Sequence, residues 1–132
     1  MSKVYAVIGA GMQGTAAAYD LAKHASPARI KMLDVSLDQA TKSSWRVNDL
    51  IGSKICEPFV VDATSHKSLV EALQGVNVLL SCVPYWMHPA IAKAAIEAKC
   101  SMCDLGGNTE VTLETLALDD QAQAAGIALV PD

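Results

Sequence analysis

Apolar residues gather along this chain in two ways: in short continuous runs, and in longer stretches where they recur every three or four positions. The short runs are rich in Val, Ile and Leu and predict buried strands. They cover residues 3–8, 30–33, 59–61, 76–82, 101–105 and 127–130. The longer stretches have the periodicity of helices that bury one face. They cover residues 12–25, 37–50, 65–73, 89–98 and 112–125.

Polar residues, Pro and Gly stand where the ends of these elements need them. Ser36 precedes the second helical stretch and Thr64 or Ser65 the third, so each can cap a helix. Pro89 falls in a first helical turn, and Gly126 follows the last helix. Strand, helix and strand in this succession join parallel neighbours through right-handed crossovers. We therefore predict an α/β fold: a doubly wound parallel six-stranded sheet of the Rossmann type, in the order 3-2-1-4-5-6.

Composition narrows the class of protein. With 132 residues, 52% of them hydrophobic and 18% charged, the chain is expected to form one domain over residues 1–132 with its own core, and disorder is excluded. No apolar run approaches the ~18 residues of a membrane span. A net charge of −4 without a basic cluster argues against nucleic-acid binding. We see no signal peptide and expect a cytoplasmic protein.

The cysteines and histidines do not predict a metal site. Cys100 and Cys103 have the spacing of half a zinc site, but no second pair of ligands follows. We expect reduced, structural thiols there and at Cys56 and Cys82. The histidines are scattered, and we expect surface or capping positions for them. They are His24, His66 and His88.

A glycine motif follows the first predicted strand and opens the first helix. It is the GxGxxG formed by Gly9, Ala10, Gly11, Met12, Gln13 and Gly14. In a dinucleotide-binding fold the first glycine permits a tight turn and the second admits a pyrophosphate close to the backbone. The third lets the helix approach the sheet. Because a helix N-terminus offers free N–H groups and partial positive charge, the motif predicts a phosphate site.

An acidic residue stands where such a site needs one. Asp34 ends the second strand, 20 residues after Gly14, and is followed by Val35. A carboxylate there accepts hydrogen bonds from the adenosine ribose and repels a 2′-phosphate. An NADP site favours an Arg just after this strand, whereas this chain has Val35 and Ser36. We therefore expect NAD as the cofactor, with NADP less favoured.

Ligands of such sheets lie outside the carboxyl ends of the strands, so the other strand ends are candidates too. Asp62 and Ala63 follow the third strand and are expected near the adenine. The residues after the fourth strand are expected beside the ribose and nicotinamide. They are Ser81, Cys82, Val83 and Pro84. Residues 104–108 follow the fifth strand. Asp104 and His88 are conceivable acid–base groups, although a strand-end turn and a helix cap explain them equally well, so the catalytic residues stay unassigned.

Three segments together resemble a known family. They are VIGAGMQGTAAAYDLAKH, LLSCVPYWMHPAIAKAAIEA and CDLGGNTEVTLETLALDDQAQAAGIALVPD, and they resemble the N-terminal domain of the saccharopine dehydrogenase and L-lysine dehydrogenase family. The resemblance implies an enzyme that oxidises an amine carbon of an amino acid, or cleaves saccharopine, and passes hydride to NAD or NADP. It assigns cofactor binding to Gly9, Gly11, Gly14 and Asp34, with the candidates after the third and fourth strands as additions.

The same resemblance predicts a second domain after residue 132 that supplies substrate contacts and acid–base groups. We therefore expect a fragment that is inactive alone, with an uncovered apolar patch that favours self-association. Two other functions remain open. One is an NAD-sensing module without catalysis. The other is an S-adenosylmethionine methyltransferase, whose sheet normally ends in an antiparallel strand.

Overall fold

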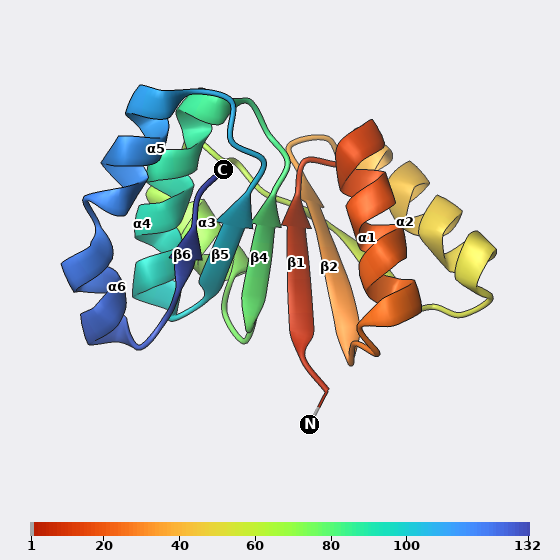
Figure 1. The fold of residues 1–132 in the computed structure, drawn as a ribbon. Helices are drawn as coiled ribbons and strands as arrows, with labels where there is room; N and C mark the ends of the chain where they lie inside the picture. Colours follow the sequence, from red (N-terminus) through yellow and green to blue (C-terminus); the bar gives the residue numbers. More distant parts are fainter. Residues whose placement is uncertain (1) are drawn as a thin grey trace.

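Six parallel strands form one sheet in the order β3-β2-β1-β4-β5-β6 in the computed structural model, which describes residues 2–132 (Figure 1). The strands are β1 (Val4–Ile8), β2 (Arg29–Asp34), β3 (Cys56–Val60), β4 (Val78–Ser81), β5 (Ser101–Asp104) and β6 (Leu129–Val130). Every neighbouring pair is parallel. The predicted fold class and strand order are confirmed.

The helices cover the sheet in two layers. They are α1 (Met12–His24), α2 (Leu37–Ile51), α3 (His66–Ala72), α4 (His88–Ala98), α5 (Thr109–Leu116) and α6 (Asp119–Ala125), with a 3-10 turn η1 (Tyr85–Met87) before α4. Helices α1 and α2 lie on one side of the sheet, and the remaining helices lie on the other (Figure 1). The strand order reverses between β1 and β4, so the carboxyl ends of these two strands flank the crevice where such folds bind ligands.

The strands bury side chains on both faces, which explains their unbroken apolar runs. In β1, Val7 packs on the α1 and α2 side, whereas Ala6 and Ile8 pack on the α3 and α4 side. In β2, Met32 and Leu33 alternate between the two sides in the same way. The period of two along each strand thus builds two apolar cores, one under each helix layer.

Side chains cap the helices at three of the loops that leave the carboxyl ends of strands. Ser36 Oγ accepts a hydrogen bond from the N–H of Gln39, at 3.1 Å, at the start of α2. Ser65 does the same for α3, and Asn108 for α5. Each cap satisfies one backbone donor that the first helical turn leaves free. Gly126 takes the left-handed conformation that ends α6.

Strand β3 starts three residues earlier than predicted and runs through Pro58. The prediction treated Pro58 as the entrance to the strand because Pro cannot donate a hydrogen bond. Since β3 is an edge strand that pairs only with β2, it needs no donor on its outer side. Strand β4 is shorter than predicted. Its predicted first residues, 76 and 77, precede the strand, although Asn77 still contacts β1: its N–H donates to the Val4 carbonyl at 2.9 Å, and its Oδ1 accepts the N–H of Val4 at 2.8 Å.

The single helix predicted over residues 112–125 is wrong: α5 and α6 are separate helices with a bend between them. Helix α5 begins earlier than predicted because Asn108 caps it. At the bend, Leu118 is buried against the core. Asp119 and Asp120 then stand in the first turn of α6, where negative charge favours a new helix start.

Strand β6 pairs parallel with β5, through Met102 with Leu129 and Cys103 with Val130. An S-adenosylmethionine methyltransferase sheet would carry an antiparallel strand at this edge, so the methyltransferase alternative loses its structural basis. Within residues 2–132, no helix combines the length and apolar character that crossing a membrane requires.

Candidate functional site

The glycine loop, residues 9–14, covers the turn after β1 and the first residues of α1, and two of its three glycines have no room for a side chain. Gly9 has a φ of +98°, and a Cβ there would lie 2.6 Å from the carbonyl oxygen of Cys82. A Cβ on Gly14 would collide with the Gly9 carbonyl. Around Gly11, in contrast, a Cβ would meet nothing within 4 Å. Gly9 and Gly14 are therefore required by the fold, whereas Gly11 leaves open space beside the backbone.

The open space lies at the N-terminus of α1. Gly11 is the N-cap, no side chain caps this helix, and its first turn has no acidic residue. Met12 is 92% exposed, so its side chain leaves the helix end accessible. The first N–H groups of a helix have no partner inside the helix. With the partial positive charge of the helix end, they form an accessible anion site.

Asp34 joins this loop to the end of β2. One of its carboxylate oxygens accepts the N–H of Ala10 and the other accepts the N–H of Ser36, each at 2.9 Å. Each oxygen keeps a further lone pair for a ligand hydroxyl. The carboxylate therefore holds the glycine loop in place and stays able to accept hydrogen bonds.

A cavity of about 290 Å³ opens beside Asp34 at the carboxyl ends of β1, β2, β3 and β4. Its lining residues are Ile8, Gly9, Asp34, Val35, Val61, Asp62, Ala63, Thr64, Val83, Pro84 and Met87. Seven of these residues were predicted from the sequence as cofactor contacts. They are Gly9, Asp34, Val35, Asp62, Ala63, Val83 and Pro84. Folding thus brings four separate predicted segments to one apolar cavity with a carboxylate at its edge.

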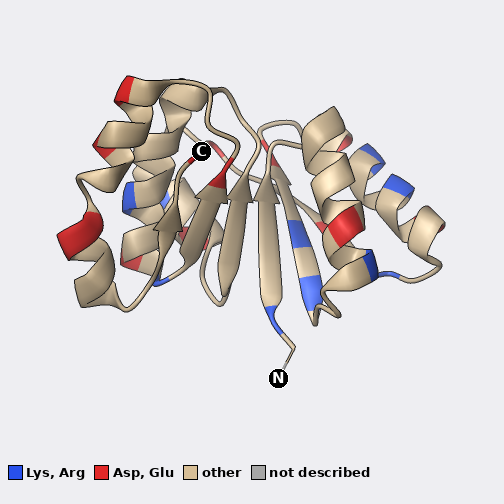
Figure 2. Ribbon diagram, in the orientation of Figure 1, with Lys and Arg blue, Asp and Glu red and all other residues tan. Residues whose placement is uncertain are grey.

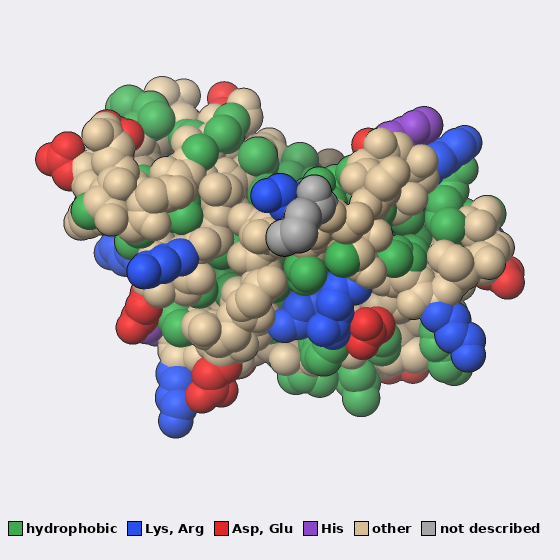
Figure 3. All heavy atoms as spheres, turned by 90° about the horizontal axis from the view of Figure 1, so that it is seen from below, with side chains coloured by type: hydrophobic (Ala, Val, Ile, Leu, Met, Phe, Trp, Pro, Cys, Tyr) green, Lys and Arg blue, Asp and Glu red, His purple; other side chains and the backbone are tan. Residues whose placement is uncertain are grey.

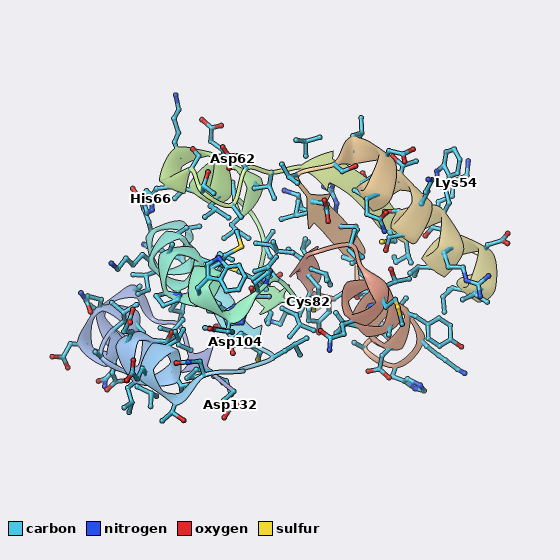
Figure 4. All side chains as sticks on the ribbon, turned by 90° about the horizontal axis from the view of Figure 1, so that it is seen from above. Lys54, Asp62, His66, Cys82, Asp104 and Asp132 are labelled. Carbon is cyan, nitrogen blue, oxygen red and sulfur yellow. The ribbon has the colours of Figure 1, made fainter. Side chains whose placement is uncertain are left out.

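Asp62 is organised by its own loop. Its Oδ1 accepts hydrogen bonds from the backbone N–H of Thr64, at 2.9 Å, and from the Thr64 hydroxyl, at 2.6 Å. These bonds hold the pKa of Asp62 below its usual value. Its own N–H donates to Ser68 Oγ at 3.0 Å. Viewed from the carboxyl ends of the strands, Cys82 and Asp104 lie near the middle of the molecule, and Asp62 lies beside α3 (Figure 4).

The residues after β4 divide into two groups. Val83 and Pro84 line the cavity, whereas the side chain of Ser81 is fully buried and hydrogen-bonded to His88 Nδ1 at 3.0 Å. Cys82 packs with the core on the α1 side, and burial raises its pKa to about 11. A ligand at this strand end would therefore contact the backbone of Ser81 and Cys82 more than their side chains.

The expectation that His88 lies at the surface or caps a helix is wrong. His88 is 2% exposed and lies at the end of β4, where it is hydrogen-bonded to Ser81. A histidine at the start of a helix resembles a cap in the sequence, and only tertiary packing covers it. Asp104 is also buried, and its Oδ1 accepts the N–H groups of Gly106, at 2.8 Å, and Asp132, at 2.9 Å.

Four cavity residues were missed by the sequence prediction: Ile8, Val61, Thr64 and Met87. Val61 and Thr64 flank the predicted pair Asp62 and Ala63, and Ile8 directly precedes Gly9, so extending these two predicted segments by one residue would have found them. Met87 lies in the turn η1, six residues past the end of β4. Met87 reaches the cavity because that turn folds back toward the strand ends. The sequence contains no signal that predicts this fold-back.

Charge is distributed along β2 in a way that bears on cofactor choice. Asp34 lies at the carboxyl end of β2, while Arg29 and Lys31 lie in its amino-terminal half (Figure 2). Arg29 pairs with Glu57 at 3.2 Å, and Lys31 donates to the carbonyl of Ala72. Basic side chains also gather on the surface at the amino ends of the strands (Figure 3). The positive charge of β2 is thus held at the end opposite to the cavity.

A larger hollow, of about 690 Å³, lies along the outer edge between α2 and β3. It is lined by Trp45, Asn48, Asp49, Gly52, Ser53, Lys54, Cys56, Glu57 and Pro58. Lys54 lies at the periphery, away from Cys82 and Asp104 (Figure 4). None of the glycine-loop residues lines it, so the smaller cavity is the better candidate site despite its size.

The cysteines of the described chain are free. Burial raises the pKa of the Cys100 thiol to about 12, and it also raises the pKa of Cys103. Across residues 2–132, His, Cys, Asp and Glu side chains form no group of three that could hold a metal ion.

Comparison with known proteins decides the family. The model of the saccharopine dehydrogenase NADP binding domain matches residues 5–130, nearly the whole chain. The chain belongs to this family. It is thus an NAD(P)-binding domain of the kind found in saccharopine dehydrogenase-like oxidoreductases, and the glycine loop, Asp34 and the cavity all lie inside the matched region.

Individual proteins resemble parts of the chain or its fold. Sorbitol-6-phosphate 2-dehydrogenase of Escherichia coli (strain K12) is 30% identical over 115 residues, which are 86% of this chain and 44% of that protein. The fold is similar to that of apo saccharopine dehydrogenase (L-Glu forming) from Saccharomyces cerevisiae, with a TM-score of 0.78 and 22% identity over 98% of this chain and 27% of that chain.

Two further structures were solved with cofactors. Quinate dehydrogenase from Corynebacterium glutamicum in complex with NAD has a TM-score of 0.71 at 18% identity, and covers 98% of this chain and 44% of its own. Triphenylmethane reductase of Citrobacter sp., complexed with NADP(H), has a TM-score of 0.68 at 20% identity, and covers 96% of this chain and 48% of its own. The chain spans less than half the length of each of these four proteins.

Proposed function

We propose that this domain binds NAD, in preference to NADP, and orients its nicotinamide ring for hydride transfer from an amine carbon of an amino-acid substrate. The observation that carries the proposal is the combination of open backbone at Gly11 with a cavity edged by Asp34. The two features are adjacent, because the Asp34 carboxylate accepts the N–H of Ala10, the residue before Gly11, as a pyrophosphate and an adenosine ribose require.

The residues fit the parts of a dinucleotide. We assign the pyrophosphate to the N–H groups at the start of α1, beside Gly11. We assign the adenosine to the apolar cavity, with its ribose hydroxyls on the Asp34 carboxylate and its base near Asp62 and Ala63. The nicotinamide end then falls toward residues 81–84 and 104–108. When bound, the cofactor supplies hydride acceptance, and the protein supplies orientation and electrostatics.

The preference for NAD rests on charge at the carboxyl end of β2. A 2′-phosphate placed beside the ribose would face the Asp34 carboxylate, and the basic residues of β2 lie at the other end of that strand. Arg46 is a basic candidate on α2, because it lines a separate hollow with Gly11 and Gln39. Should NADPH bind more tightly than NADH, Arg46→Ala tests whether this residue holds the phosphate.

We place the substrate contacts and the acid–base residues outside residues 1–132. The proteins that this chain matches are more than twice its length. The two acid–base candidates inside the chain, His88 and Asp104, are buried and do not line the cavity. The domain alone is therefore expected to bind cofactor without turning over an amino acid.

The test is a titration of the protein with NADH, NADPH and S-adenosylmethionine, followed by fluorescence and calorimetry. We expect NADH to bind more tightly than NADPH, and Asp34→Asn to weaken NADH binding about tenfold, as the loss of a charged hydrogen bond requires. Asp38→Asn is a matched control, since Asp38 is an exposed acid on α2 that pairs with Lys42 and does not line the cavity. Absence of nicotinamide nucleotide binding at millimolar concentration would refute the proposal.

A further inference from the structure

His88 combines two features that seldom occur together. It is the first residue of α4 and its side chain is 2% exposed, although histidine is usually at least partly accessible. Its Nδ1 lies 3.0 Å from Ser81 Oγ, whereas its Nε2 is buried and has no hydrogen-bond partner within residues 2–132. A buried polar atom without a partner weakens a fold, so its retention calls for a role in function.

The Ser81 contact ties His88 to the centre of the sheet. Ser81 is the last residue of β4, and its neighbours in the sheet are Ile8 at the end of β1 and Asp104 at the end of β5. The imidazole therefore sits under the carboxyl ends of the strands, where the strand order reverses. Met87, one residue earlier, lines the cavity, and His88 does not, so His88 lies behind the cavity wall.

The imidazole also lies next to the end of β5, because its partner Ser81 is paired in the sheet with Asp104. Burial lowers the pKa of His88, and the Asp104 carboxylate and the Gly106 backbone oppose this effect. Asp104 in turn accepts the N–H of Gly106 at 2.8 Å. A Cβ on Gly107 would lie 3.3 Å from Tyr85 Cβ, which shows that the loops after β4 and β5 touch.

We propose that His88 is a positioning residue that holds these two loops, residues 82–87 and 105–108, in the arrangement that seats the nicotinamide ring. Nδ1 holds the β4 end through Ser81, and Ser81 in turn is the sheet neighbour of Asp104, where the β5 loop begins. His88 itself does not line the cavity. This inference rests on the proposed function, since it concerns the nicotinamide half of that site.

Two ligands separate the halves of the site. NADH occupies both, whereas ADP-ribose lacks the nicotinamide ring and reports on the pyrophosphate and adenosine half. We expect His88→Leu to weaken NADH binding about tenfold, the effect of one lost buried hydrogen bond. ADP-ribose affinity should stay within about twofold of wild type, as expected for a distant, independent site. Ser81→Ala removes the same bond and should act in the same direction, with the double variant no weaker than His88→Leu.

Two further variants separate positioning from stability. His88→Asn keeps an amide at the Nδ1 position for Ser81 and should restore most of the NADH affinity. Ile91→Val trims a buried residue of the same helix that does not line the cavity, and should lower the melting temperature without changing NADH affinity. If His88→Leu does not fold, Ser81→Ala and His88→Asn carry the comparison.

The outcomes are distinct. Equal losses for NADH and ADP-ribose, or unchanged NADH binding in the folded variants, would overturn the role assigned to His88. If wild type binds neither ligand, the proposed function itself fails, and the assignment of His88 falls with it before any variant is compared.

Discussion

Gly11 caps α1 and Gly14 lies in its first turn, and the structure predicts opposite results for the same substitution at these two positions. Gly11 has φ −77° and ψ −159°, which alanine adopts easily, and a methyl group there meets nothing within 4 Å. At Gly14 a methyl group would lie far inside the 3.0 Å limit of real contacts with the Gly9 carbonyl. Gly11→Ala should therefore affect the ligand, and Gly14→Ala should affect the fold.

The stability effects follow from these contacts. Alanine is a poorer N-cap than glycine by up to about 1 kcal/mol. Alanine also restricts the unfolded chain more than glycine does, which stabilises the folded protein by about 0.4–1 kcal/mol. The net change for Gly11→Ala is therefore below about 1 kcal/mol, or about 4 °C in melting temperature. Gly14→Ala forces α1 away from the loop and should cost about 3 kcal/mol or more, as overpacked cores do.

The binding effect has a separate origin. A methyl group on Gly11 would occupy the space through which a pyrophosphate approaches the N–H groups of α1. Losing one hydrogen bond to a charged group costs about 1.5–3 kcal/mol, which corresponds to a ten- to hundredfold weaker binding of NADH. The loss should be shared by NADH, NADPH and ADP-ribose, because all three carry the pyrophosphate.

The assay pairs thermal unfolding with NADH titration for wild type and both variants. The reasoning requires a nearly unchanged melting temperature with weakened binding for Gly11→Ala, and a lowered melting temperature of about 10 °C for Gly14→Ala. Wild-type affinity in a folded Gly11→Ala protein would refute the assignment of this loop to the pyrophosphate. An unchanged melting temperature for Gly14→Ala would show that the helix can shift without cost.

Three further predictions concern stability and reactivity. Burial lowers the pKa of His88, so the unfolded chain binds more protons than the folded one below pH ~6.5, and the free energy of unfolding should fall as the pH falls from about 7 into that range. Urea unfolding at a series of pH values should show a smaller fall for His88→Asn than for wild type. An equal pH dependence of the two proteins would contradict this. Burial raises the pKa of Cys100 to about 12 and of Cys82 to about 11, so iodoacetamide at pH 7.5 should modify these thiols only after unfolding. Rapid labelling of either thiol in the folded protein would contradict this prediction. Ser36→Ala removes the cap on the N–H of Gln39 and should lower the free energy of unfolding by about 1 kcal/mol, whereas Ser36→Asp keeps a capping oxygen and should leave this free energy unchanged. Equal free energies of unfolding for the two variants would show that the cap is unimportant.

Local signals in the sequence determined the fold class, the strand order and the glycine loop. Apolar runs and helical periodicity act over a few residues, and crossover handedness then allows few topologies. Elements were misplaced where a wider context overrides a local signal. Pro58 is acceptable inside β3 only because that strand lies at the edge, and the bend at Leu118 divides α5 from α6 because the core takes that side chain.

The candidate site shows the same division. Gly9, Gly11, Gly14 and Asp34 are visible in the sequence because their chemistry depends on spacing along one strand, loop and helix. That Asp34 accepts the N–H of Ala10, and that Met87 reaches the cavity, follow only from segments that meet in space.

His88 is the strongest instance of what tertiary structure alone decided. In the sequence it is one of three scattered histidines, and it stands beside the start of a predicted helix. In the fold it is 2% exposed and bonded to Ser81, whose neighbour in the sheet is Asp104 at the end of β5. Burial depends on every element that packs around a side chain, and no local pattern of polar and apolar residues encodes it.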